Sequence, residues 1–176
     1  MIKVHIMVGV SASGKTTMSK SIVQKENATR ISSDEIRLDF INRGVLDMES
    51  GFSPDGHALV FKTLYDKARE LVQQGKDILI DAQNLRMKYR QVYFKALEDF
   101  DCYFIAHVMM TEKSECERRY AQRDLNECFY PSKVPQRKTM DDRFRMFEMP
   151  TKQEGFDEIR LITEEQQSEN FNRRRK

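Results

Sequence analysis

The stretch Gly9-Val10-Ser11-Ala12-Ser13-Gly14-Lys15-Thr16 matches the pattern G-x-x-x-x-G-K-[ST] at every fixed position. It follows an apolar run, Ile2–Val8, that predicts a buried strand, and it opens a helical pattern that continues to about Gln24. A glycine-rich turn between a strand and a helix points backbone N–H groups and the positive end of the helix dipole at one place. The stretch therefore predicts a phosphate-binding loop (P-loop) whose nucleotide-binding residues are Gly9, Ser11, Ala12, Ser13, Gly14, Lys15, Thr16 and Thr17.

Two side chains of this loop suit phosphate and metal binding, and a motif that the sequence lacks bears on which nucleotide is bound. Lys15 places a cation beside the β- and γ-phosphates, and the Thr16 hydroxyl is a suitable ligand for Mg²⁺. The Asn-Lys-x-Asp element with which GTPases bind guanine does not occur in the sequence. We therefore expect ATP and Mg²⁺ as cofactors.

The rest of the chain alternates short apolar runs with longer helical patterns, which predicts βαβ units and a parallel sheet. The expected class is a three-layer α/β/α fold with a five-stranded parallel sheet in one domain, residues 1–165. Residues 166–176 read as a polar and then basic C-terminal tail. The expected strands are Ile2–Val8, Thr29–Ile31, Asp77–Ile80, Cys102–Met110 and Phe156–Ile162.

The composition excludes several classes of protein. The 176 residues carry 30 Lys+Arg and 28 Asp+Glu, a formal net charge of +2, which permits a nucleic-acid partner without requiring one. No apolar run approaches the roughly 18 residues of a membrane-spanning helix, and no signal-peptide pattern opens the chain. We therefore expect a cytoplasmic protein without a membrane partner. His5 and His107 lie within apolar runs, which favours buried histidines over metal ligands.

Asp34 is the first candidate for chemistry beyond the loop. It follows the second expected strand, so a parallel sheet places it at the carboxyl edge, where the P-loop also lies. A carboxylate there can accept the proton of an attacking hydroxyl, or it can serve only as a charge that complements a helix N-terminus. The spacing of Ser32 and Glu35 around it predicts a helix capping box.

Two further groups of residues bear on the transfer of a phosphate. Asp81 ends the third strand and is a candidate to hold Mg²⁺ through water, and Asn84 is either a substrate contact or the cap of the next helix. Thr111 is expected to cap a charged helix after the fourth strand. Arg119 and Arg123 share one face of that helix, which suits either a lid over the transferring phosphoryl group or a solvated basic face.

Taken in their order along the chain, these motifs resemble those of the P-loop kinase family of the phage polynucleotide kinase type. The matching segments are residues 9–17, 31–37, 81–85, 119–123, 134–135, 147–151 and 154–159. The resemblance implies a P-loop kinase fold with a small helical lid at about residues 112–135, and a phage-encoded enzyme in the host cytoplasm. By the same resemblance, the catalytic residues are Lys15, Asp34 as general base, and Arg123 as lid arginine assisted by Arg119, while Arg37, Asp81 and Asn84 lie on the substrate side and Thr16 holds the metal.

The expected function is transfer of the γ-phosphate of ATP to a 5′-hydroxyl end of DNA or RNA. A kinase of a nucleoside, another small-molecule hydroxyl or a hydroxymethylated DNA base stays open, as do a non-catalytic ATP-binding switch and a homo-oligomer. The basic and aromatic side chains near these motifs read either as an acceptor groove or as ordinary surface. They are Arg30, Arg37, Lys88, Tyr89, Arg90 and Tyr93.

Overall fold

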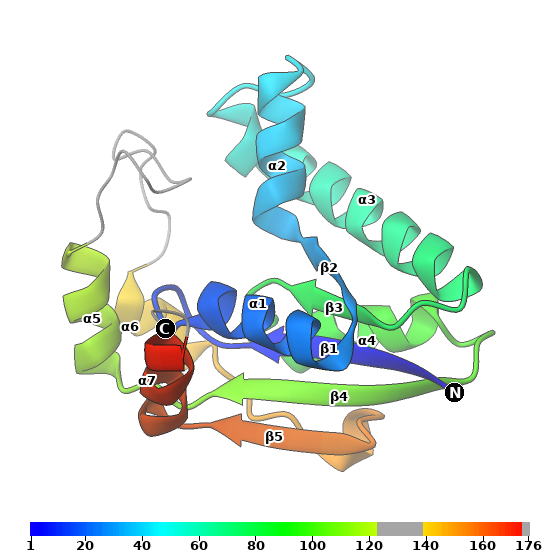
Figure 1. The fold of residues 1–176 in the computed structure, drawn as a ribbon. Coiled ribbons are helices and arrows are strands. Elements are labelled where there is room, and N and C mark those ends of the chain that lie inside the picture. The colour runs from blue at the N-terminus through cyan, green and yellow to red at the C-terminus, as the bar shows by residue number, and fades with distance from the viewer. Residues whose placement is uncertain (123–138, 174–176) are drawn as a thin grey trace.

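A five-stranded parallel sheet with the strand order β2-β3-β1-β4-β5 forms the centre of the molecule (Figure 1). The structure is a computed structural model that describes residues 1–122 and 139–173. The strands are β1 (Ile2–Val8), β2 (Thr29–Ser32), β3 (Ile78–Asp81), β4 (Cys102–Met109) and β5 (Glu158–Ile162). The expected five-stranded parallel sheet is confirmed.

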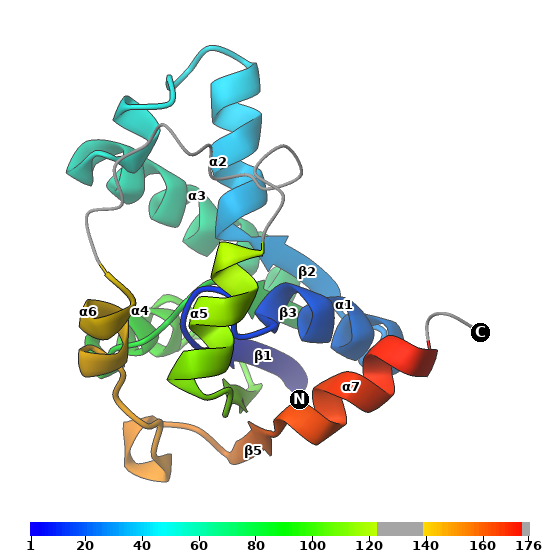
Figure 2. The same cartoon turned by 90° about the vertical axis from the view of Figure 1, so that its left-hand side faces the viewer.

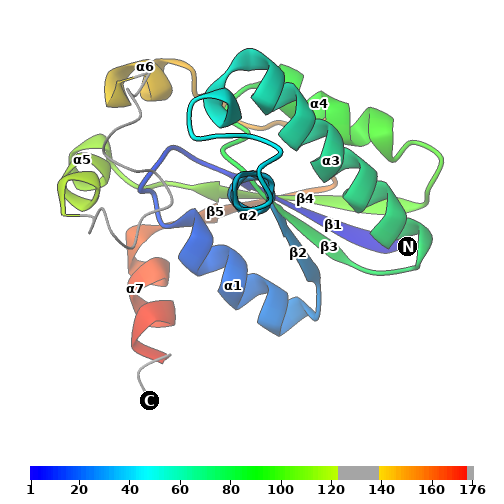
Figure 3. The ribbon, with the colours of Figure 1, turned by 90° about the horizontal axis from the view of Figure 1, so that it is seen from above.

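Helices cover both faces of the sheet. Seen from above, α3 and α4 lie on one side of the strands and α1 and α7 on the other (Figure 3). The helices are α1 (Lys15–Glu26), α2 (Ser33–Asn42), α3 (Pro54–Gln73), α4 (Met87–Ala96), α5 (Lys113–Ala121), α6 (Met140–Arg145) and α7 (Glu164–Arg173), with short 3-10 helices η1 (Ser50–Phe52) and η2 (Lys152–Glu154). None of the helices in the described ranges is long and apolar enough to cross a membrane.

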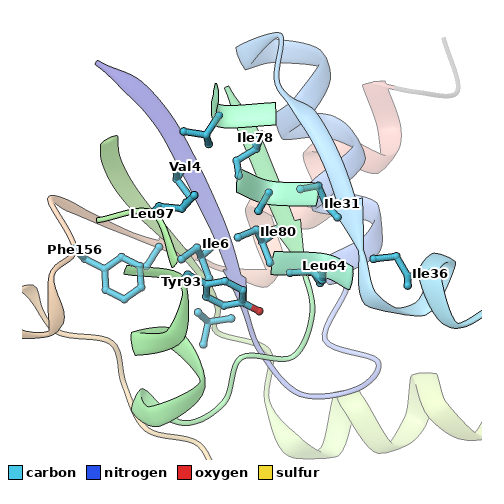
Figure 4. Close-up of a cluster of buried hydrophobic side chains, with 14 of the residues drawn as sticks. Val4, Ile6, Ile31, Ile36, Leu64, Ile78, Ile80, Tyr93, Leu97 and Phe156 are labelled. Atoms are coloured by element: carbon cyan, nitrogen blue, oxygen red, sulfur yellow. The ribbon is translucent and has the colours of Figure 1, made fainter. Parts of the chain in front are cut away.

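The two faces of β1 follow from the alternation of side chains along a strand. Val4, Ile6 and Val8 join the larger core cluster, which takes in α3 residues at a spacing of four and Tyr93 of α4 (Figure 4). Met7 points to the opposite face and packs with Met18 and Ile22 of α1. A sheet covered on both sides in this way needs nearly continuous apolar strands, and β1 and β3 have them.

The ends of three helices differ from the sequence prediction, either in their capping contacts or in their position. The Ser32 hydroxyl accepts from the Glu35 N–H as expected, but the Glu35 carboxylate pairs with Arg30 instead of closing the capping box. Thr111 does not cap α5, because its hydroxyl donates to the Ser13 carbonyl in the P-loop, and Glu112 takes the cap position. The tail expected from residue 166 is helical as far as Arg173, since α7 docks against α1.

A buried histidine pair lies on the α1 face of the sheet. His5 and His107 occupy neighbouring strands, and 2.9 Å separates Nδ1 of His5 from Nε2 of His107. Burial lowers the pKa of His5, and burial together with the neighbouring His5 lowers the pKa of His107 to about 3. Both rings are therefore neutral in the folded protein at neutral pH, whereas histidines in the unfolded chain protonate near pH 6.5.

The pair predicts a loss of stability on acidification. Because the folded pKa of His107 lies below the unfolded value, its contribution is complete above pH 6.5 and declines as the pH falls towards 3. Urea unfolding at pH 7.5 and 5.5 should show that His107→Gln loses about 1 kcal/mol less between the two values than the parent protein. An identical pH dependence of the two proteins would contradict the assignment of a neutral buried pair.

Candidate active site

The P-loop connects β1 to α1 at the carboxyl edge of the sheet. The Gly9 N–H donates to the Gln83 carbonyl at 3.0 Å, and a Cβ on Gly9 would lie 2.8 Å from the Ser13 hydroxyl and 2.9 Å from Met109 Cβ. Gly14 has φ of +91°, which a residue with a side chain rarely adopts. The motif's two glycines are therefore required by close approach and by backbone conformation.

The loop is held in shape by its own polar groups. The Ser13 hydroxyl donates to the Val10 carbonyl at 2.8 Å, and the Lys15 ammonium donates to the same carbonyl at 2.6 Å. Lys15 and Thr16 begin α1, and the Thr16 side chain is exposed. The structure thus brings all the predicted nucleotide-binding residues, from Gly9 to Thr17, into one turn around the start of a helix, the arrangement that binds phosphate.

Arg143 of α6 also reaches this loop, and nothing in the sequence pattern pointed to it. Its guanidinium donates to the Ser11 hydroxyl, which also accepts from the Gln83 amide at 3.1 Å. An apolar cluster that includes Val10 and Phe144 packs α6 against the loop. Figure 2 shows α5 and α6 on the side of the molecule where the P-loop lies. Arg143 therefore adds a cation at the P-loop that comes from a distant segment.

Arg119, expected to assist the lid arginine Arg123, lies next to Gly14. One guanidinium nitrogen is 3.4 Å from the place where a Cβ on Gly14 would lie. Arg119 donates to the Glu115 carboxylate at 2.6 Å and to the Gln167 amide oxygen of α7 at 2.9 Å. The arginines at 118 and 119 lower the pKa of Glu115 to about 2. Arg123 and the remainder of the expected lid lie outside the described residues.

Gln167 is a second residue that the sequence did not single out. Its amide nitrogen donates to the Thr111 hydroxyl at 2.9 Å, and Thr111 in turn donates to the Ser13 carbonyl at 2.9 Å. Together with the Arg119 contact, these bonds connect helix α5, the end of β4 and helix α7 to the P-loop. Gln167 is buried although α7 is polar overall, and that low hydropathy concealed it in the sequence.

The carboxylate of Asp81 is largely occupied by protein donors. Its Oδ2 accepts from the Ser19 hydroxyl at 2.8 Å and from two nitrogens of Arg30 at 2.7 and 2.9 Å. Within the described part of the chain, no donor reaches Oδ1. Arg30 also pairs with Glu35, so it is an internal counter-ion of β2 and not part of an acceptor groove.

The side chains that could hold Mg²⁺ are few, which fits a metal ion bound mainly by the nucleotide. The Thr16 hydroxyl is exposed at the start of α1, and the second oxygen of Asp81 has no donor among the described residues. The described residues contain no group of three or more His, Cys, Asp or Glu that could hold a metal ion. A hydroxyl and one carboxylate oxygen suit Mg²⁺ that is bound largely by phosphates and water.

Asp34 lies in the first turn of α2 with 47% of its side chain exposed. It accepts from Arg37 at 3.1 Å. Arg37 is itself 2% exposed and also donates to the Gly51 carbonyl at 2.9 Å, and its second terminal nitrogen is 3.2 Å from His57 Nδ1. Arg37 thus fixes the orientation of Asp34 and attaches α2 to the segment before α3.

Asn84 and two of the candidate groove residues face inward. The Asn84 amide donates to the Met7 carbonyl at 2.8 Å and its oxygen accepts from the Tyr93 hydroxyl at 2.8 Å. Arg90, fully buried, donates to the Asn84 carbonyl and pairs with Glu154. Asn84 is therefore a buried brace beneath the P-loop, and it does not cap α4, whose N-cap position is Arg86 without a side-chain cap. Because Arg90 and Tyr93 are buried, neither sequence interpretation, an acceptor groove or ordinary surface, holds for these two residues.

The sequence profile of the AAA domain family matches residues 4–149. The chain belongs to this family. No curated protein sequence shows significant similarity to it.

Solved structures similar to this AAA domain include several kinases. A sugar kinase from Janibacter sp. HTCC2649 has a TM-score of 0.65 at 16% identity, covering 99% of this chain and 92% of that chain. The APS kinase CysC of Mycobacterium tuberculosis, in complex with AMPPNP and APS, has a TM-score of 0.59 at 19% identity, covering 99% and 98%. A chain of the Pnkp1/Rnl/Hen1 RNA repair complex has a TM-score of 0.61 at 19% identity, covering 82% of this chain and 42% of its own. At these identities the likeness establishes the three-layer P-loop kinase fold.

The position of Arg143 leads to a test in an ATP-dependent assay. We expect Arg143→Gln to lower kcat/KM for ATP about 10-fold or more, because a charge-assisted hydrogen bond at the P-loop is lost. Arg145→Gln, an exposed neighbour on the same helix, is the matched control and should behave like the parent protein. Equal activity of the two variants would remove Arg143 from the site.

Removing Arg30 from its buried ion pair with Asp81 is expected to lower the free energy of unfolding strongly. Arg30→Met should cost about 3 kcal/mol of unfolding free energy in urea titrations, because Asp81 would remain as an uncompensated buried charge. Adding Asp81→Asn should recover part of that loss. Arg43→Met, which breaks an exposed pair with Asp39, should cost less than about 1 kcal/mol. A similar loss in Arg30→Met and Arg43→Met would contradict this interpretation.

Proposed function

We propose that this protein is an ATP-dependent polynucleotide 5′-hydroxyl kinase that transfers the γ-phosphate of ATP to a 5′-OH end of DNA or RNA. The observation that carries the proposal is the placement of Asp34. It is a half-exposed carboxylate at the same sheet edge as the P-loop, and a buried arginine holds its orientation. A hydroxyl acceptor needs a base in this position, whereas a nucleotide switch does not.

The proposed reaction balances with the groups of the site. Asp34 accepts the proton of the 5′-hydroxyl as its oxygen forms a bond to the γ-phosphorus, and the bond from that phosphorus to the β–γ bridging oxygen breaks to release ADP. Lys15, Arg119 and Arg143 supply positive charge around the transferring group. Arg123 adds a lid arginine by the family resemblance. Mg²⁺, when bound, neutralises phosphate charge, and Thr16 and Asp81 are the residues that would hold it.

Two comparisons support a polynucleotide acceptor. The ordered motifs resemble phage polynucleotide kinases, including the kinase half of the T4 enzyme, which favours a phage-encoded enzyme acting in the host cytoplasm. A chain of an RNA repair complex that contains Pnkp1 shares the fold.

A small-molecule kinase is the second candidate. Its support is that the sugar kinase and the APS kinase match this chain over nearly their whole lengths.

A transfer assay with γ-labelled ATP and Mg²⁺ separates the two. The acceptors are 5′-hydroxyl oligonucleotides of DNA and RNA, the same oligonucleotides carrying a 5′-phosphate, and a panel of nucleosides, gluconate and APS. We expect label on the 5′-hydroxyl oligonucleotides alone. Label on a small molecule would establish the second candidate, and ATP binding without any labelled acceptor would favour a switch.

A further inference from the structure

Four aromatic rings form a continuous row along η1 and α3, and they have no role in the reaction proposed above. The ring row is defined here as Phe52 of η1 with His57, Phe61 and Tyr65 of α3. The last three are four residues apart, so they share one helix face. Successive ring centroids along the row are 6.4, 6.5 and 6.1 Å apart.

Both ends of the ring row are attached to the candidate active site. At one end, Tyr65 packs edge-on against Tyr93 at 5.3 Å, and the Tyr93 hydroxyl bonds to Asn84, the brace beneath the P-loop. At the other end, the Arg37 guanidinium lies over the Phe52 ring at 4.9 Å and also contacts His57 and Asp34. The row therefore runs from below the phosphate-binding loop to the proposed base.

Core packing does not account for the ring row. His57 is exposed, and Phe52 and Phe61 are only half-buried. Among the apolar side chains that pack on the core clusters of the described residues, Tyr65 appears but Phe52 and Phe61 do not. Half-exposed flat rings close to Asp34, the proposed base, suit the binding of a nucleobase, because every nucleobase offers a π-face for stacking.

The charges around the ring row limit how much of a nucleic acid it can hold. The segment before α3 carries acidic side chains at 47 and 49, and the first turn of α3 carries one at 55. Lys62 on α3 is paired with Asp66. Several backbone phosphates would be repelled there, since phosphate binding requires unpaired basic groups. The row therefore fits one or two bases next to the reacting end better than a long strand.

We propose that the ring row is a stacking subsite for the terminal nucleobase of the acceptor, with Phe61 at its centre. The inference rests on the proposed function and deepens it, because such a subsite selects acceptors that carry a base and disfavours sugars. In this arrangement the base lies on the rings of α3 while its 5′-hydroxyl is presented to Asp34.

The test compares 5′-hydroxyl oligonucleotides that carry or lack the terminal base. With the parent protein we expect the abasic acceptor to have a KM about 10-fold higher. Phe61→Leu keeps an apolar side chain but removes the flat ring. It should raise KM about 10-fold for the base-bearing acceptor, leave the abasic acceptor unchanged, and leave KM for ATP unchanged. Tyr103→Leu, a half-buried aromatic near the amino end of β4, should match the parent protein.

A binding measurement keeps the subsite distinguishable from the proposed function. Fluorescence anisotropy of labelled base-bearing and abasic oligonucleotides is measured on Asp34→Asn, with and without Phe61→Leu. Tight, base-dependent and Phe61-dependent binding without transfer by the parent protein would retain the subsite and overturn the kinase assignment. Transfer that depends neither on the terminal base nor on Phe61 would overturn the subsite and retain the kinase. Absence of both binding and transfer would overturn both.

Discussion

The parallel alignment of five strands is the constraint on which the rest of the structure depends. It places the carboxyl ends of all strands at one edge, and each strand there delivers a different part of the site. The P-loop follows β1, Asp34 follows β2, Gln83 follows β3, Thr111 follows β4 and Gln167 follows β5. Crossover helices bury both faces of the sheet, so this edge is where polar groups from all five strands can meet.

At this edge, Arg37 connects the start of α2 to the segment that leads into α3. A buried guanidinium is tolerated only where its charge and donors are satisfied. Arg37 meets this condition with the Asp34 carboxylate, the Gly51 carbonyl and a nitrogen of His57. Through these contacts, the orientation of the Asp34 side chain depends on the segment that leads into α3. The role of Arg37 as a substrate-side contact stays a prediction.

The sequence predicted those features that depend on local patterns. The P-loop, the strand at Ile2–Val8 and the helix after Ser53-Pro54 each follow from spacing, capping or glycine requirements within a few residues. The predicted parallel sheet placed Asp34 at the carboxyl edge, where the structure has it, without any knowledge of its partners. These features account for most of the fold and for the phosphate-binding half of the site.

The remainder depended on contacts between segments far apart in the chain. Asp81 and Asn84 are polar residues at a strand end, and sequence alone does not show whether such groups face a ligand or an internal partner. Arg143 and Gln167 reach the P-loop from 132 and 153 residues away in the chain, with no motif around them. Among the described side chains of α7, the buried amide of Gln167 contacts the site, and the polar residues around it in the sequence resemble a solvated tail.

The role of Asp34 as general base is tested most directly by single-turnover transfer from labelled ATP to a 5′-hydroxyl oligonucleotide by Asp34→Asn. ATP affinity is measured on the same protein. Asp39→Asn, exposed on the same helix, is the matched control. We expect Asp34→Asn to lower the transfer rate at least about 100-fold with ATP affinity unchanged, while Asp39→Asn retains both. Undiminished transfer by Asp34→Asn would contradict the assignment of Asp34 as the general base.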